Sequence, residues 1–418
     1  MNAVVKSDSS SGCKVYRYKL STGGYCYILP CRNDSLNCAA VVVNAGSAEN
    51  HAFVNGEKIT FPTGTAHFLE HKMFEKENGD MMAEFSSLGA NVNAFTDMSR
   101  TVYYFSARGN FEKALEKLVI MVYSPYFCEE TIENEKKIIT REMAMYKDNP
   151  SWNAYFSMLG CLYNKNRRFL QPCGNKREVG KINSSTLYKF YNCFYTGDNI
   201  SFVVCTSLDP MMCAEIIEKN IIVRNSGEIY FEYEKYKKPV RCIAEQRGSV
   251  NMPVHSMGFR LERLRTDVKN ICAVNMLFEM AAGKSSPLAD KLIEKEISSF
   301  IPSLSQCFGR GFYFAAADCS GFGGEKIVKL MEKAFENIYH NGIDEQRLAH
   351  TKKVMEENII SLLHSAESTM FLQSYIAAAK GDVTDMLSVI RGMEKEYLYE
   401  ALKRSFVNNV SVFSSFGV

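Results

Sequence analysis

Several classes of protein are disfavoured by what this 418-residue sequence lacks. It has no uninterrupted apolar run of about 18 residues, which is the length that a membrane-spanning helix needs. It has no cluster of Lys and Arg, and its formal net charge is only +2, so we do not expect a nucleic-acid-binding surface. The first residues, MNAVVKSDSSSG, contain no apolar export segment. We therefore expect a cytoplasmic protein.

Closely spaced cysteine pairs are also absent, although the chain contains 14 cysteines. No Cys-x-x-Cys motif occurs, and most of the thiols lie inside apolar segments such as Val204-Cys205 and Ile271-Cys272. Cysteine in such a setting behaves as a small apolar residue. We expect buried free thiols in a reducing compartment, and not a disulfide framework.

Histidine is scarce, with 7 residues in the chain, yet two of them share the pentapeptide His67-Phe-Leu-Glu-His71. On a helix, His67 and His71 face the same way, and Glu70 lies on that face too. Two imidazoles can hold a divalent metal, zinc by default, and a neighbouring carboxylate can take a proton from water. The order His-x-x-Glu-His is the inverted form of a common zinc-protease signature.

The alternative for this pentapeptide is a surface helix with two solvated histidines. Phe68, Leu69, Met73 and Phe74 surround the polar residues with apolar side chains. This pattern favours a helix that is buried within a domain.

A zinc hydrolase needs a third protein ligand, and two glutamates downstream have a suitable spacing. Glu135 and Glu142 are seven residues apart, so two helical turns place them on one face. From spacing alone, either could reach the metal, and both could instead belong to a solvated charged face.

Hydrophobic periodicity predicts an alternation of strands and helices along the whole chain. Strands are expected at 14–30 (a hairpin), 39–44, 91–95, 101–106, 201–205, 255–259, 312–317 and 410–414. The metal-motif helix is expected to begin near residue 64. Further helices are expected at 80–88, 110–123, 130–147, 151–163, 184–194, 210–219, 267–282, 287–298, 324–340 and 344–365, with helical pattern to about 404.

The two halves of the sequence have a similar order of elements, which predicts an internal duplication. The polar segment 223–240 has little apolar periodicity and is the predicted linker. We therefore predict an N-terminal domain at 1–222 that carries the metal and a C-terminal domain at 241–418 that lacks the metal motif.

Three segments resemble the pitrilysin/insulinase zinc peptidases, family M16. They are Gly64-Thr-Ala-His67-Phe-Leu-Glu70-His71-Lys-Met-Phe74, Asn91-Val-Asn93-Ala94-Phe95-Thr96, and Glu135-Lys-Lys-Ile-Ile-Thr-Arg-Glu142 with the residues that follow to Pro150. Tyr195 and Asn199 also fit the family's pattern further along the chain. The length is similar to that of the small M16B-like subfamily. Within it, the sequence resembles bacterial members associated with elongation-factor P modification and the metal-bearing subunits of paired proteases in ribosomal-peptide maturation.

This resemblance implies an α+β fold with two tandem homologous α/β-sandwich domains, each a mixed, mostly antiparallel sheet covered by helices. Together they would form half of the family's clamshell. It also implies that Glu142 is the third ligand of one Zn2+ per chain and that Glu135 is a helper carboxylate behind it. Glu70 would be the catalytic base of a metalloendopeptidase. The substrate-binding strand, which receives an extended peptide, would consist of Asn91, Val92, Asn93, Ala94 and Phe95.

One departure from the family pattern concerns an Arg and a Tyr, seven residues apart, that bind the substrate backbone in active members. The matching positions here are Ile293 and Phe300, and neither side chain can donate a hydrogen bond. We therefore expect a homologous partner chain that carries the Arg and Tyr, in a heterodimer, although a homodimer is the other possibility.

Two rival functions differ in class from this one. A catalytically silent M16-like scaffold or assembly subunit would lack metal, and the intact histidine pair with Glu70 and Glu142 argues against it. A zinc hydrolase acting on a non-peptide substrate is disfavoured by the strand-like segment Asn93-Ala-Phe-Thr96, because recognition of an extended backbone suits peptides.

Overall fold

The computed structural model describes residues 2–31, 36–77, 79–224, 228–233, 235–237, 239, 243–248, 250–294, 301–407, 409 and 411–417. Two compact units interleave along the chain. The first consists of Met1–Arg141, Gln171–Glu232 and Ile359–Asp385, and the second of Glu142–Leu170, Tyr233–Asn358 and Met386–Val418. One crossing between them, after Glu232, lies within the predicted linker 223–240. The predicted boundaries at 222 and 241 remain predictions.

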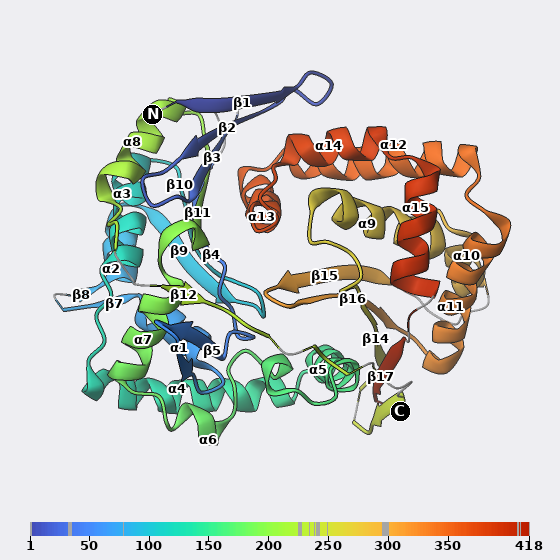
Figure 1. Ribbon diagram of the computed structural model, residues 1–418, viewed down its shortest axis with the longest axis horizontal. Coiled ribbons are helices and arrows are strands. Elements are labelled where there is room, and N and C mark those ends of the chain that lie inside the picture. The colour runs from blue at the N-terminus through green and yellow to red at the C-terminus, as the bar shows by residue number, and fades with distance from the viewer. Residues whose placement is uncertain are drawn as a thin grey trace. The chain divides into compact units, whose positions relative to one another are not determined.

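The first unit contains a seven-stranded sheet with the order β1-β2-β3-β11-β4-β10-β9 (Figure 1). β3 and β11 run parallel, and the other neighbours run antiparallel. The strands are β1 (Ala3–Asp8), β2 (Cys13–Lys19), β3 (Tyr25–Pro30), β4 (Asn37–Val43), β9 (Ala90–Thr96), β10 (Thr101–Ala107) and β11 (Ile200–Thr206). The position of β9 at the edge of the sheet matters for the site.

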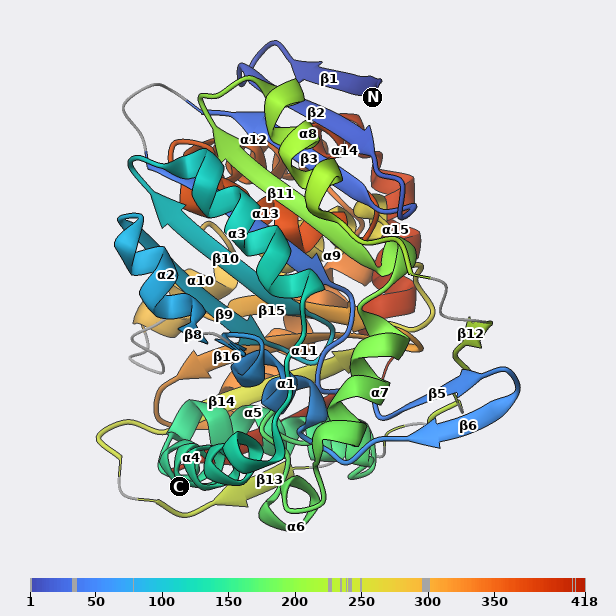
Figure 2. The same ribbon diagram turned by 90° about the vertical axis from the view of Figure 1, so that its left-hand side faces the viewer.

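Helices cover both faces of this sheet. α3 (Phe111–Tyr123) and α8 (Pro210–Asn220) contact β3, β4 and β10, and α13 (Ala366–Ala377) contacts β4 and β11. Figure 2 shows α3 and α8 in front of the sheet, with α13 behind it. Since the central strands are enclosed on two sides, β11 is buried along its whole length, and its apolar run ISFVVCT suits that environment.

The remaining elements of the first unit lie around this sheet. The helices are α1 (Thr65–Lys72), α2 (Met81–Ser87), α6 (Lys176–Val179) and α7 (Ser184–Phe194), with α4 (Glu129–Lys147) continuing past the division at Arg141. The short strands are β5 (His51–Val54), β6 (Glu57–Thr60), β7 (Glu75–Lys76), β8 (Gly79–Asp80) and β12 (Ile229–Tyr230).

The second unit contains a five-stranded sheet with the order β13-β17-β14-β16-β15. The strands are β13 (Ile243–Gln246), β14 (Val254–Arg260), β15 (Ser303–Gly309), β16 (Phe312–Ser320) and β17 (Val412–Phe416). The helices are α5 (Pro150–Leu162), α9 (Val268–Ala282), α10 (Pro287–Glu294), α11 (Gly324–Asn341) and α15 (Lys395–Leu402), with α12 (Glu345–Leu362) and α14 (Val383–Gly392) crossing between the units.

Both sheets have the same strand order. The five strands β3, β4, β9, β10 and β11 and the five strands β13 to β17 are each arranged as first, fifth, second, fourth, third. In each sheet the first and fifth strands run parallel. These matching orders confirm the predicted fold class, with two tandem homologous domains built on mixed, mostly antiparallel sheets.

One helix of each sequence half packs on the sheet of the other half. α5 contacts β14 and β17, whereas α13 contacts β4 and β11, the strands at the equivalent places. The approach of α5 is close, because a Cβ atom at Gly258 of β14 would lie 2.2 Å from the sulfur of Met158. Glycine at 258 is therefore what this contact requires.

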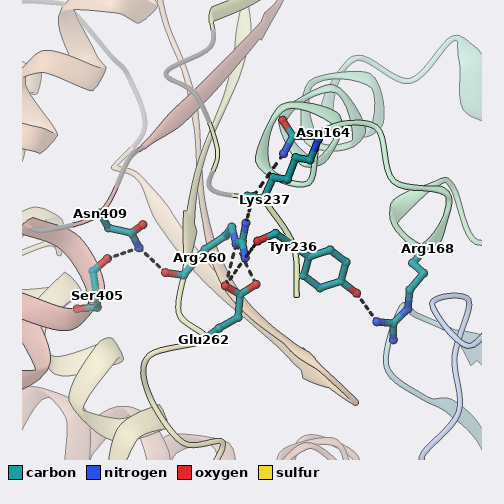
Figure 3. A network of polar contacts seen from close by, with 8 residues as sticks. All are labelled: Asn164, Arg168, Tyr236, Lys237, Arg260, Glu262, Ser405 and Asn409. Carbon is teal, nitrogen blue, oxygen red and sulfur yellow. Dashed lines mark hydrogen bonds and ion pairs between the residues drawn. The ribbon is translucent and has the colours of Figure 1, made fainter. Parts of the chain in front are cut away.

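A network of polar side chains holds the segment around Tyr236 and Lys237 inside the second unit (Figure 3). Arg260 of β14 pairs with Glu262 and donates to the backbone carbonyls of Tyr236 and Lys237. The hydroxyl of Tyr236 accepts a hydrogen bond from the buried Arg168. This part of the predicted linker is thus fixed by side chains of the second unit.

The predicted strands and helices are present, with shifts of a few residues at their ends. The sequence patterns did not indicate eight strands and one short helix, which are β1, β5, β6, β7, β8, β12, β13, β15 and α6. The predicted helix 287–298 is observed as α10, which ends at Glu294, and the next residues lie outside the described part of the chain. None of the described helices has the length and apolar character needed to cross a membrane.

Within the described part of the chain, twelve cysteines are free thiols, and eight of these are buried, as expected from their apolar surroundings. Burial raises the pKa of several of them, for example the pKa of Cys38 and of Cys213 to about 12. Cys161 departs from the expectation, because it is disulfide-bonded.

Candidate metal centre

The helix α1 that carries the metal motif is buried, and its start is fixed by a glycine. Gly64 precedes the helix with φ 93°, and a Cβ atom there would lie 2.7 Å from the carbonyl oxygen of Cys173. Both facts require glycine at this position. Seven of the eight helical residues are buried, against α7, β9 and β10. The alternative of a solvated surface helix is therefore wrong.

The structure brings His67, His71 and Glu142 together. The two imidazole rings lie one helical turn apart, with centroids separated by 4.6 Å. One ligand atom from each histidine and a carboxylate oxygen of Glu142 all lie within 4.8 Å of one another. Two imidazoles and one carboxylate are the donor set of a catalytic zinc site that keeps a position open. The residues present fit zinc.

Glu135 lies beside this cluster and holds one of its histidines. Its Oε1 accepts a hydrogen bond from Nδ1 of His71 at 2.9 Å, and the two side chains are 17% and 25% exposed. With the proton on Nδ1, the lone pair of the ring is on Nε2, the nitrogen that can bind a metal. Spacing alone left Glu135 and Glu142 equivalent, and the structure gives them different neighbours.

Glu142 has a further partner that the sequence patterns did not indicate. The hydroxyl of Tyr146 donates to Oε1 of Glu142 at 2.8 Å. Tyr146 in turn stacks on Trp152 of α5, with ring centroids 4.3 Å apart and an interplanar angle of 12°. The available signal was the i, i+4 spacing of Glu142 and Tyr146 on one helix.

Glu70 is buried next to the histidine pair and is held from the neighbouring sheet. The hydroxyl of Thr96, the last residue of β9, donates to Oε2 of Glu70 at 2.8 Å. Thr96 ends the segment 91–96 that resembles the family's edge strand, but sequence reasoning gave it no role of its own.

The predicted substrate strand forms most of β9, at the open edge of the sheet. Its residues pair with β10, for example Asn93 opposite Tyr104. The side chains of Asn91 and Asn93 are exposed, whereas Val92 is buried. The backbone amide of Ala94 donates to Oδ1 of Asn93 at 2.8 Å, so a side-chain oxygen takes the place of a neighbouring strand's carbonyl. Phe95 is half-buried.

Of the two positions that match the Arg and Tyr of active members, Ile293 lies at the end of α10. Ile293 is 57% exposed, so it is not part of a core. Phe300 lies outside the described residues. The prediction that a partner supplies the missing groups therefore remains a prediction.

Comparisons with known proteins agree with this arrangement. Residues 33–160 match the family "Insulinase (Peptidase family M16)", and residues 181–355 match "Peptidase M16 inactive domain". The "Uncharacterized zinc protease YmfH" of Bacillus subtilis (strain 168) is 34% identical over 359 residues, which covers 81% of this chain and 82% of that protein. The chain therefore belongs to peptidase family M16. Membership of this family supports a peptidase-type function.

Two further proteins show how far the similarity reaches. An M16-like peptidase from Alicyclobacillus acidocaldarius superimposes with a TM-score of 0.89 at 22% identity, covering 97% of this chain and 98% of that one, which shows a shared fold. The mitochondrial-processing peptidase subunit beta of Mus musculus is 29% identical over 142 residues, 33% of this chain and 29% of that protein.

Proposed function

We propose that this chain is a zinc-dependent metalloendopeptidase subunit that hydrolyses peptides. His67, His71 and Glu142 would hold one Zn2+, which when bound polarises the scissile carbonyl and makes the attacking water more acidic. The observation that carries the proposal is the His-His-Glu cluster beside a buried glutamate that Thr96 holds in place.

Glu70 is the general base in this proposal. It takes the proton of the attacking water and later gives it to the nitrogen of the leaving amine. Glu135 keeps the proton of His71 on Nδ1 and orients the ring, which is the usual role of a carboxylate behind a histidine ligand.

The substrate would bind as an additional strand along β9. Main-chain hydrogen bonds give such a complex affinity for extended peptides with little dependence on sequence. A substrate carbonyl can replace Oδ1 of Asn93 as the acceptor for the amide of Ala94. The exposed side chains of Asn91 and Asn93 would then flank the bound peptide.

A homologous partner chain would supply the Arg and Tyr that bind the substrate backbone and stabilise the oxyanion. Ile293 offers no donor at the matching position in this chain. The relative from Mus musculus is named as a subunit, which supports an assembly of this kind. The pair of chains would enclose a chamber that admits peptides, and the many free thiols favour a cytoplasmic location.

Zinc content and peptide cleavage test this proposal. The purified chain should contain one zinc per molecule and cleave unstructured peptides in the presence of its partner. Glu70→Gln should keep the zinc and lower kcat/KM by about 10²- to 10⁴-fold, because the general base is removed. His67→Ala should lose the zinc, since one of three ligands is gone.

The matched control is His350→Ala, which removes an exposed histidine of α12 and should retain zinc and activity. Stoichiometric zinc in His67→Ala, or normal cleavage by Glu70→Gln, would contradict the assigned roles. A wild-type chain that cannot be loaded with metal would favour the scaffold function instead.

A further inference from the structure

A chain of hydroxyl groups adjoins Glu70, and the proposed function uses only its first member, Thr96, without assigning it a part in the reaction. The hydroxyl of Thr96 lies 3.3 Å from that of Thr101, the first residue of β10. Tyr195 interacts with Thr101, and its hydroxyl lies 2.8 Å from that of Tyr103. Thr101, Tyr103 and Tyr195 are buried. The chain thus runs from the interior of the first unit to the carboxylate.

The donors of this chain can be assigned by counting protons, because each hydroxyl has one proton to give. Thr101 donates to the carbonyl oxygen of Ala45 at 2.9 Å. The proton of Thr96 is donated to Oε2 of Glu70 at 2.8 Å, so no proton lies between the two threonine oxygens, which are 3.3 Å apart and only in contact. This assignment gives the bond a fixed direction and requires Glu70 to act as an acceptor.

The tyrosines keep the buried end of the chain protonated. Burial raises the pKa of Tyr103 and of Tyr195 far above the usual range, so neither phenol ionises near neutral pH. Hydrogen bonds among such groups are strong inside a protein and hold each other in place. Thr101 is therefore held in place beside Thr96.

We propose that Thr96 is a positioning residue for the reaction, which fixes the carboxylate of Glu70 through one oxygen and leaves the other to meet the water. This role rests on the proposed peptidase function. A general base has to lie within hydrogen-bond reach of the proton it takes, so its orientation affects the chemical step. Thr96 is placed to set this orientation because β9 packs against α1.

The test compares Thr96→Val with Thr96→Ser. Valine has the shape of threonine without the hydroxyl, so Thr96→Val should lower kcat by about 10- to 100-fold, the usual effect of losing a supporting partner of this kind. KM should stay within about twofold of the wild type, and one zinc per chain should remain bound. Thr96→Ser restores the donor and should restore kcat. Thr60→Val, at an exposed strand position, is the control and should behave as the wild type.

Two further measurements separate positioning from a general structural role. In the Glu70→Gln background, Thr96→Val should cause no additional loss of kcat, because the group that it orients is already altered. A crystal structure of metal-free Thr96→Val should show Glu70 in more than one rotamer, where the wild type shows one.

The outcomes distinguish this proposal from the function on which it rests. Wild-type kcat in Thr96→Val, a rise in KM alone, or a single ordered Glu70 rotamer in that variant would overturn the role of Thr96 while wild-type cleavage still stands. A wild-type chain that never cleaves peptides with its partner present would overturn the proposed function, and this role with it.

Discussion

Each acidic side chain of the candidate metal centre has its own hydrogen-bond partner. Thr96 donates to Glu70, Nδ1 of His71 bonds to Glu135, and Tyr146 donates to Glu142. Because these bonds orient the carboxylates before any metal is bound, the side chains would need little rearrangement when a metal binds. Supporting contacts of this kind commonly affect metal affinity as strongly as they affect activity.

Tyr146 offers a direct test of this view for the third ligand. Tyr146→Phe removes the hydroxyl that orients Glu142 and keeps the ring stacked on Trp152, so zinc should bind about 10-fold more weakly. Competition with a chromophoric chelator measures the dissociation constant. Tyr230→Phe, which keeps its stack on Phe53, is the control. Equal zinc affinity in both variants would show that the Tyr146 hydroxyl has no such role.

The residues of the site differ in how far the sequence could reveal them. His67, Glu70 and His71 lie within one helical turn, so their shared face follows from helix geometry. Glu142 needed the family resemblance, because the sequence alone did not separate it from Glu135. Thr96 and Tyr146 were not predicted. Thr96 meets Glu70 only through the packing of β9 on α1, a contact between segments 26 residues apart.

Among the elements, β9 combines an open edge with a residue that contacts the proposed base. Successive residues of a strand point their amides alternately toward and away from a given neighbour. A peptide that adds to β9 would therefore use every second backbone amide. The amide of Ala94, now bonded to Asn93, marks one position on this edge that can receive a substrate carbonyl.

This alternation predicts a pattern in substrate modification. Peptides that are N-methylated at one amide at a time should show KM raised about fivefold at every second position, since each lost hydrogen bond is worth about 1 kcal/mol. The intervening positions are the matched control and should change KM little. Steady-state kinetics on such a series would reveal the period. Equal losses at all positions would argue against strand addition.

The sequence could not predict which sheet α5 and α13 pack on, although each helix packs on the sheet of the other sequence half. Periodicity predicted a helix at 151–163 and a further helical pattern that continues to about 404 and includes the place of α13. The pattern says that a helix buries one face, but it does not say which sheet covers that face. Gly258, whose lack of a side chain admits Met158 of α5, had no sequence signal that pointed to a helix so distant in the chain.

On the scale of the whole molecule, the two halves share a fold, but only one of them has the residues of the candidate metal centre. Both sheets have the same strand order, yet the histidine pair is found in the first half alone. The similar order of elements in the two halves made this duplication predictable from the sequence. The groups that bind the substrate backbone were harder to predict, because the family resemblance places Ile293 and Phe300 at the Arg and Tyr positions and does not say what takes their place.

The last prediction concerns that replacement. The chain alone should cleave peptides slowly, because no Arg or Tyr stands at the positions that stabilise the oxyanion in active relatives. Adding a homologous chain with Arg and Tyr seven residues apart, and no metal motif, should raise kcat/KM by about 10²- to 10³-fold, the value of one well-placed oxyanion donor. Mixing assays at fixed zinc, with light scattering to follow a 1:1 complex, would measure this.

The matched control is a partner in which the Arg is replaced by Ala, which should still form the complex and fail to activate it. The partner's Tyr→Phe variant should lose part of the gain, since it removes one hydroxyl donor. If the chain alone reached the full rate, or if the Arg→Ala partner activated as well as the unaltered one, the substrate-binding groups would have to lie within this chain. The search for them would then begin at the donors that surround β9, because that strand is where the peptide would bind beside Glu70.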